Sequence, residues 1–96
     1  MASSEREPLD FAIGGPIERV DLPGLCERVC ALLERSEGTV ARCDVSAAEP
    51  DAVTVDALAR LQLAAQRHGC EVRLRHATRE LLALVAFMGL RDVLTE

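Results

Sequence analysis

The sequence predicts one α/β domain: a mostly parallel sheet of about four strands, with helices mainly on one face. Ninety-six residues, of which 49% are hydrophobic, are enough to build a single core. Strand-like and helix-like stretches alternate β-α-β-α-β-α, which favours parallel strands joined by right-handed helical crossovers. In two of the strand-like stretches, Arg42, Arg73 and Arg75 point to one side. We therefore expect one face of the sheet to lack a helical cover.

The first strand and helix are predicted within residues 9–38. Residues 1–8 form a polar stretch, expected to be a disordered lead, so residues 9–96 make up the predicted domain. Residues 9–17 alternate like a strand that is interrupted by Gly14-Gly15-Pro16. Asp21 is a possible N-cap of a helix that ends at Gly38. Its apolar stripe is predicted to contain Leu22, Leu25, Val29, Leu32 and Leu33.

A second strand and helix follow over residues 39–69. Residues 39–45 place Ala41, Cys43 and Val45 on one strand face. The next helix is predicted from Thr54, its expected N-cap, to residue 68, before Gly69. Leu58, Leu61 and Ala65 form its predicted core stripe, and Leu63 points away from that stripe toward solvent.

The last predicted strand covers residues 71–76 and alternates strictly. Val72, Leu74 and His76 share its apolar side, so His76 is expected to be a packed side chain. Thr78 is predicted to cap a final helix that closes at Gly89. The remaining tail is expected to add a short strand or a helical turn.

Composition argues against several partners. The net charge is −5, and Phe11 and Phe87 are the only aromatic residues, so neither a basic patch nor stacking platforms for nucleic acid are expected. The apolar run at 81–90 is about half of the roughly 20 residues that span a bilayer. The polar N-terminus lacks the pattern of a signal peptide, which favours a cytoplasmic protein with free thiols.

Neither an enzyme nor a cofactor site is predicted. The sequence contains no recognisable nucleophile–base set, and Gly14-Gly15-Pro16 is followed by no Gly-Lys-Ser, so it is a turn signal and not a phosphate loop. Cys26 and Cys30 would share a helix face, but their spacing from each other and from the histidines is poor for zinc. A thiol or metal sensor built on these cysteines remains a predicted alternative of another class.

The stretch between residues 43 and 68 is the predicted functional junction. A strand that ends with Asp44 and Ser46 leads through Glu49-Pro50-Asp51 to a helix that opens near Thr54. A helix N-terminus presents free N–H groups and a partial positive charge, which favour anions or acidic partners. Thr54 and Ser46 also have simpler interpretations, as a helix cap and a turn residue.

Several motifs in this order resemble the STAS family. They are Asp44-Val45-Ser46, the stretch Ala-Leu-Ala-Arg-Leu at 57–61, His68-Gly69 before the strand at 71–74, and Met88-Gly89-Leu90. Together they cover roughly the C-terminal two-thirds of the chain. Family members are regulatory binding modules: anti-sigma-factor antagonists, stressosome subunits, anion-transporter tails and small subunits of lipid-transporting ABC systems. The resemblance implies a STAS-like domain and a protein–protein interaction module, with no enzymatic activity.

The resemblance also implies a phosphorylation switch at the start of the second helix. In antagonists, a partner kinase phosphorylates a Ser or Thr there. Alignment on Ala57-Leu58 places Val55, which has no hydroxyl, at the acceptor position. Thr54 or Ser46 is then the candidate phospho-acceptor, or the module works without phosphorylation; Asp51 and Asp56 already supply negative charge there.

The expected function is therefore that of an anti-sigma-factor-antagonist-like regulator in a partner-switching pathway of transcription. The alternative is an accessory subunit of an ABC lipid-transport complex. The expected partner is an anti-sigma-type serine kinase or, in the alternative, a transporter ATPase, and a homodimer is also open. The candidate partner-binding residues are Asp44, Ser46, Glu49, Asp51, Thr54, Val55, Asp56 and Leu63.

Overall fold

The computed structural model describes residues 9–35 and 40–96. The predicted disordered lead at 1–8 and the predicted helix end at Gly38 lie outside these ranges. The elements, in chain order, are β1 (Leu9–Ala12), the short 3₁₀ helix η2 (Arg19–Asp21), α1 (Leu22–Arg35), β2 (Val40–Asp44), α2 (Ala52–Arg67), β3 (Glu71–Arg75) and α3 (Arg79–Phe87).

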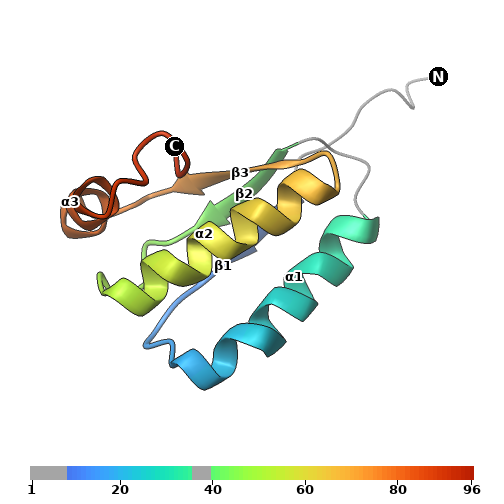
Figure 1. The fold of residues 1–96 in the computed structure, drawn as a ribbon, viewed down its shortest axis with the longest axis horizontal. Coiled ribbons are helices and arrows are strands. Elements are labelled where there is room, and N and C mark those ends of the chain that lie inside the picture. The colour runs from blue at the N-terminus through green and yellow to red at the C-terminus, as the bar shows by residue number, and fades with distance from the viewer. Residues whose placement is uncertain (1–8, 36–39) are drawn as a thin grey trace.

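The described residues form a parallel sheet of three strands in the order β1-β2-β3 (Figure 1). Phe11 pairs with Cys43, and Cys43 with Leu74, at the centre of the sheet. About four strands were expected, but the tail contributes only an isolated bridge between Thr95 and Arg73. The first strand ends at Ala12 and not at residue 17, since the chain turns through Gly15, whose φ is +70°.

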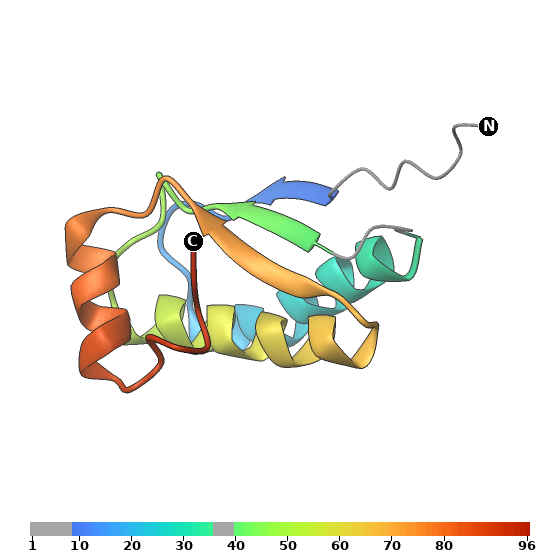
Figure 2. The ribbon, with the colours of Figure 1, turned by 90° about the horizontal axis from the view of Figure 1, so that it is seen from above.

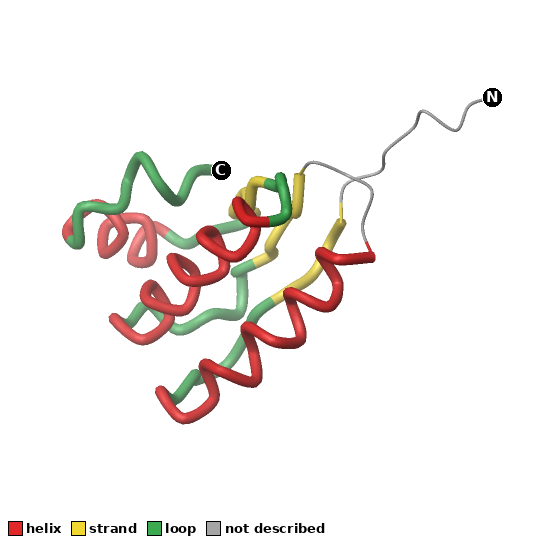
Figure 3. The backbone as a smooth tube through the Cα atoms, turned by 45° about the vertical axis from the view of Figure 1, so that its right-hand side comes forward, coloured by secondary structure: helices red, strands yellow, loops and turns green. Residues whose placement is uncertain are grey.

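The helices α1 and α2 lie side by side on the same face of the sheet (Figure 2), and α3 stands beyond the end of the strands. Helix α2 is central, with α1 on one flank and the C-terminal tail on the other (Figure 3). The opposite sheet face carries Asp10, Arg42, Arg73 and Arg75, which are exposed or half-exposed. This face is the charged one that the strand alternation predicts.

The core fills the space between the sheet and the two helices. The side chains of Ala41, Cys43 and Val45 are fully buried from the sheet side. Leu58, Leu61 and Ala65 of α2 pack in the same core from the helix side and are also fully buried, as predicted. Full burial of each leucine contributes about 1.5–3 kcal/mol. Leu63 is 56% exposed, which confirms that it points away from this core.

The start of α2 differs from the prediction. The helix begins at Ala52, and its N-cap is Asp51, whose carboxylate accepts a hydrogen bond from the N–H of Thr54 at 2.8 Å. The expectation that Thr54 caps this helix is therefore wrong: it occupies the third helical position. In α3, by contrast, Thr78 is the N-cap as predicted, and its hydroxyl accepts from the N–H of Leu81 at 3.2 Å.

Two side chains expected in the core are exposed. His76 is not packed on the apolar side of β3, because the strand ends at Arg75 and the backbone of His76 turns out with φ +60°. Its side chain is 64% exposed. Leu32 of α1 is 38% exposed, since it lies at the flank of the buried stripe of Leu22, Val29 and Leu33.

Gln62 is a buried polar residue that fixes the outer edge of β3. Its amide nitrogen donates to the carbonyl oxygen of Val72 at 3.1 Å, and its amide oxygen accepts from the N–H of Val72 at 2.8 Å. The same nitrogen donates to the carbonyl of Val93 in the tail at 2.8 Å. One side chain therefore joins α2, β3 and the C-terminal tail.

Among the described residues, none of the helices has the length and apolar character needed to cross a membrane.

Candidate functional site

The predicted functional junction lies where the parallel strands reach their carboxyl ends. Asp44 ends β2, and His76 directly follows β3. Because the carboxyl ends of parallel strands meet at the same end of the sheet, these two residues come together although 32 positions separate them along the chain. The distance between His76 Nδ1 and Asp44 Oδ2 is 3.5 Å.

Asp44 organises the first turn of the junction. Its carboxylate accepts a hydrogen bond from the N–H of Ser46 at 2.9 Å, which closes a side-chain turn after the strand. This bond, together with nearby His76, holds the pKa of the Asp44 carboxyl below its usual range. Ser46 is an exposed residue at the end of β2, and its side chain also contributes to lowering the pKa of Asp44.

The loop between Ser46 and Asp51 is held against the loop that follows β1. The N–H of Gly15 donates to the carbonyl of Ala47 at 2.8 Å, and Ala48 forms a bridge with Gly15. A Cβ at Gly14 would lie 3.0 Å from the Cβ of Ala47, so this approach leaves little room for a larger residue. The contacts of Ala47 and Ala48 with Gly15 therefore hold the backbone between the exposed residues Ser46 and Glu49.

Two of the candidate partner-binding residues lie in the interior. Thr54 and Val55 both have 0% relative exposure. The hydroxyl oxygen of Thr54 has no hydrogen-bond partner among the described residues. Neither side chain can contact a partner while α2 stays packed, and a kinase cannot reach the Thr54 hydroxyl in this conformation.

Asp56 ties α2 to the segment that precedes α1. Its carboxylate accepts from Arg60 Nε at 3.1 Å, one helical turn on, and from Arg19 Nη1 at 3.0 Å, 37 positions away. The guanidinium groups of Arg60 and Arg19 hold the pKa of the Asp56 carboxyl below its usual range. Arg19 was not among the predicted site residues, since no local pattern indicates a contact over such a separation.

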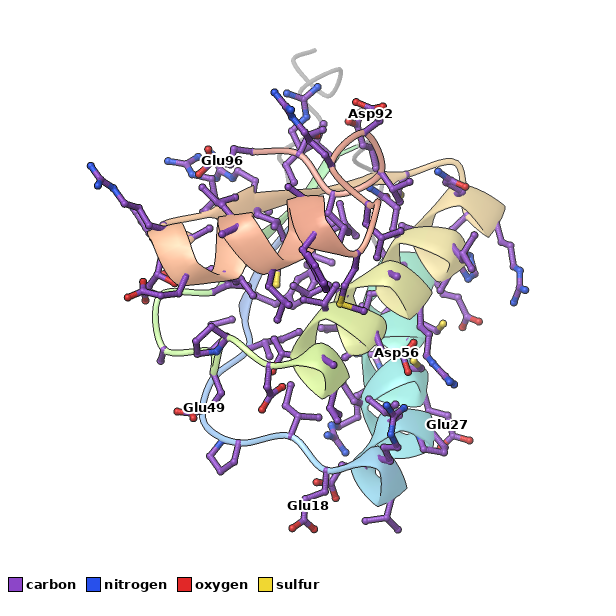
Figure 4. The ribbon with its side chains drawn as sticks, turned by 60° about the vertical axis from the view of Figure 1, so that its left-hand side comes forward. Glu18, Glu27, Glu49, Asp56, Asp92 and Glu96 are labelled. Carbon is purple, nitrogen blue, oxygen red and sulfur yellow. The ribbon has the colours of Figure 1, made fainter. Side chains whose placement is uncertain are left out.

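The exposed candidates form two groups. Ser46, Glu49 and Asp51 belong to the loop and the start of α2. Asp56 and Leu63 lie on the outer side of α2, seven positions apart and hence about 10 Å along the helix. Figure 4 shows Glu49 projecting from the loop, while Asp56 lies over the boundary between α2 and α1. The first group continues from the loop into the start of α2, and the second lies farther along that helix.

The open sheet face carries a shallow hollow of about 270 Å³ near the same end. Arg42 and Asp10 face each other across it as a paired guanidinium and carboxylate, at 2.6 and 2.8 Å. The bond with Arg42 holds the pKa of the Asp10 carboxyl below its usual range. Arg75 and His76 line the hollow as well. Acids and bases alternate there, so the hollow offers no concentrated charge of either sign.

The four cysteines, all among the described residues, are distributed over α1, β2 and the position just before β3. Cys26 and Cys30 are half-buried on α1, and Cys43 is buried in the sheet, where burial raises the pKa of its thiol to about 12. No cluster of three or more His, Cys, Asp or Glu side chains suited to a metal ion occurs in residues 9–35 and 40–96.

Comparison of the sequence with models of known protein families gives no match, and a search of curated proteins finds no significant relative.

Proposed function

We propose that this protein is a STAS-like protein–protein interaction module, an anti-sigma-factor-antagonist-like regulator of transcription that acts in the cytoplasm without catalysis. Its docking surface consists of the loop residues Ser46, Glu49 and Asp51 and the outer side of α2 with Asp56 and Leu63. We call these five residues the α2 docking surface. The expected partner is an anti-sigma-type serine kinase.

The observation that carries this proposal is the exposure of Leu63. It is 56% exposed in the second half of α2. Burial of this apolar side chain against a partner would be favourable, and the nearby acids would help to select that partner. Asp56 is suited to selecting a partner because its ion pairs with Arg19 and Arg60 already hold its carboxylate in one position.

Phosphorylation, if it regulates this module, is expected at Ser46. Ser46 is an exposed residue, whereas Thr54 is fully buried. A phosphate on Ser46 would add nearly two negative charges beside Asp44, and repulsion would weaken the turn that their hydrogen bond closes. Regulation at Ser46 would therefore act by reshaping the loop of the α2 docking surface.

The test is a pull-down from extract of the native cell with wild-type protein, Leu63→Asp and, as a matched control, Phe87→Asp. Phe87 is 87% exposed on α3, away from the α2 docking surface. Leu63→Asp is expected to lower recovery of the partner about tenfold or more, because burying an aspartate in an apolar contact costs more than 1.4 kcal/mol. The Phe87→Asp variant is expected to recover the partner as well as wild type does.

The identity of the captured protein distinguishes the two versions of the proposal. A serine kinase of the anti-sigma class supports the partner switch, and a transporter ATPase supports the accessory-subunit alternative. Incubation with the captured kinase and ATP is expected to label wild type and Thr54→Val but not Ser46→Ala. Equal recovery with wild type and Leu63→Asp would contradict the proposed surface.

A further inference from the structure

The exposed side of α3 is apolar beyond its first turn. Leu81 and Val85, one turn apart, pack in the core and are at most 2% exposed. Each residue of a helix is rotated by about 100° from the one before it, so the opposite side of α3 is centred on residue 83. The exposed residues there are Ala83, Ala86 and Phe87, which we call the α3 outer face. A helix that is apolar on all sides is usually covered on all sides.

Phe87 is the largest side chain of the α3 outer face. It is 87% exposed at the last position of α3, and Met88 beside it, the C-cap, is 39% exposed. Burial of a phenylalanine side chain removes about 150–250 Å² from water. Covering Phe87 is therefore the main apolar gain that this side of the molecule offers to a binding partner.

The α3 outer face is open to the approach of another molecule. Figures 1 and 2 show α3 at one end of the long axis of the molecule, with no described element beyond it. The buried side of α3 packs toward the core and α2, so its outer face points away from both. A second molecule can therefore meet this face without displacing α1, α2 or the sheet.

Charged residues of both signs lie at each end of the apolar stretch. They are Arg79 and Glu80 in the first turn of α3, and Arg91 and Asp92 just after its end. The N–H of Leu90 donates to the carbonyl of Val85 at 2.9 Å, which keeps the following turn against the end of the helix. All four charged side chains are exposed, and none forms an ion pair within the described part of the chain.

We propose that the α3 outer face binds a second copy of this chain, with the two α3 helices antiparallel about a twofold axis level with Val85. In such a pair, the start of each helix lies beside the end of the other. Phe87 of each copy then packs against Ala83 of the other, where the small methyl group leaves room for the ring. Glu80 comes close to Arg91 of the second copy, at both ends of the contact.

The order of the charges favours a second copy in this orientation. Antiparallel helices bring Glu80 to Arg91 and Arg79 to Asp92, so opposite charges meet at both ends. Parallel helices would instead set each of these residues against its own copy. A membrane with anionic lipids would attract the two arginines but repel the two acids, and the chain has a net charge of −5. Charge complementarity therefore favours a second copy over a lipid surface.

The area available sets the expected strength of the dimer. Helix α3 has nine residues and is hence about 14 Å long. Two Phe87 side chains together would bury roughly 300–500 Å². An interface below about 1,200 Å² is at the small end for specific association. We therefore expect a weak dimer, with a dissociation constant between about 10 µM and 1 mM.

The first test is sedimentation equilibrium of the full chain between about 10 µM and 1 mM. Wild type is expected to dimerise, and Phe87→Asp is expected to raise the dissociation constant about tenfold or more, because the aspartate would be buried in an apolar contact. The matched control is Leu63→Asp, which places the same charge at an exposed apolar residue of α2 and is expected to leave the dimer intact. Circular dichroism checks that each variant is folded.

Charge reversal tests the antiparallel orientation. Glu80→Arg and Arg91→Glu are each expected to raise the dissociation constant about threefold or more, because each sets like charges against each other at both ends of the contact. The double variant is expected to return the dissociation constant close to that of wild type, since opposite charges meet again. Single variants that dimerise as wild type does, or a double variant that is not restored, would contradict this pairing.

A monomer at concentrations up to about 1 mM would overturn the proposal, and so would a dimer that Phe87→Asp leaves unchanged. For a monomer, loss of the captured protein in the Phe87→Asp pull-down would assign the α3 outer face to that protein. Sedimentation of a monomer with phosphatidylglycerol vesicles that requires Phe87 would assign the face to lipid. The result is independent of the proposed function, because Leu63→Asp tests the α2 docking surface and leaves the α3 outer face unaltered.

Discussion

At the residue scale, Thr54 shows how a single position acquires its role from its surroundings. Its side chain is fully buried, and its hydroxyl oxygen finds no partner in the described structure, while its backbone N–H is the group that Asp51 caps. A buried hydroxyl without a hydrogen bond costs about 1–3 kcal/mol in desolvation. The residue therefore contributes to packing through its methyl group and reduces stability through its oxygen.

Replacing Thr54 with valine is expected to stabilise the protein by about 1 kcal/mol, because the change removes the unpaired oxygen and nearly preserves the shape of the side chain. Urea denaturation measures the change. Thr78→Val is the matched control: it removes a hydroxyl that does accept a hydrogen bond, at the N-cap of α3, and is expected to destabilise by about 1 kcal/mol. Destabilisation by Thr54→Val would show that its hydroxyl has a partner after all.

His76 illustrates a limit of strand periodicity. The alternation of Val72 and Leu74 continues formally to His76, yet the strand ends one residue earlier and His76 adopts φ +60°. Histidine tolerates this left-handed conformation better than most side chains do. A periodic pattern indicates which side chains share a face only as long as the strand lasts, and the sequence does not mark where it stops.

At the element scale, two polar side chains of α2 hold the elements on its two flanks. Gln62 holds β3 and the tail to α2, and Asp56 holds η2, the segment just before α1, to α2. Both residues lie on the same helix, so α2 positions the elements on either side of it. The predicted core stripe of α2 explains its burial, while these two polar residues determine what lies against its flanks.

Replacing Gln62 with leucine is expected to destabilise the protein by about 2–3 kcal/mol, since it leaves the N–H and the carbonyl of Val72 and the carbonyl of Val93 without their partner. Urea denaturation measures the loss, and amide exchange at Val72 should become faster. Gln66→Leu, on the exposed side of the same helix, is the control and is expected to change stability by less than about 0.5 kcal/mol. Equal effects of the two substitutions would refute the role of Gln62 at the strand edge.

At the scale of the whole molecule, the ion pairs make stability depend on pH. The pKa values of Asp10, Asp44 and Asp56 are all held below their usual range by hydrogen bonds and neighbouring cations. A carboxyl whose pKa is lower in the folded state contributes stability above its unfolded pKa of about 3.9, and that contribution is lost as the pH falls through the folded pKa. Stability should therefore fall steadily below about pH 5.

The measurement is the free energy of unfolding from urea denaturation between pH 7 and pH 2. Asp56→Asn, which cannot titrate at this position, is expected to show a shallower acid decline than wild type, with lower stability at neutral pH because the ion pairs with Arg19 and Arg60 are weakened. Parallel profiles for the two proteins would show that Asp56 does not contribute to the acid sensitivity.

The candidate site could be predicted only in part. The exposed leucine, the Asp44–Ser46 strand end and the acidic loop follow from local patterns in the sequence, and the structure places them at or near the surface. The burial of Thr54 could not be anticipated in the same way, because it depends on Asp51 and not Thr54 being the N-cap. Once the helix begins at Ala52, Thr54 lies one turn before Leu58 and shares its buried stripe.

The sequence by itself determined the alternation of strands and helices, the parallel sense of the sheet and the apolar side of each element, because these depend on short-range periodicity. Tertiary structure decided which backbone groups at the sheet edges are hydrogen-bonded. Gln62 and the tail bond to the outer edge of β3, whereas no other part of the described chain pairs with the outer edge of β1. It also decided that Arg19 forms an ion pair with Asp56. Such contacts join residues far apart in the chain, and only the folded backbone fixes which polar groups remain to be paired.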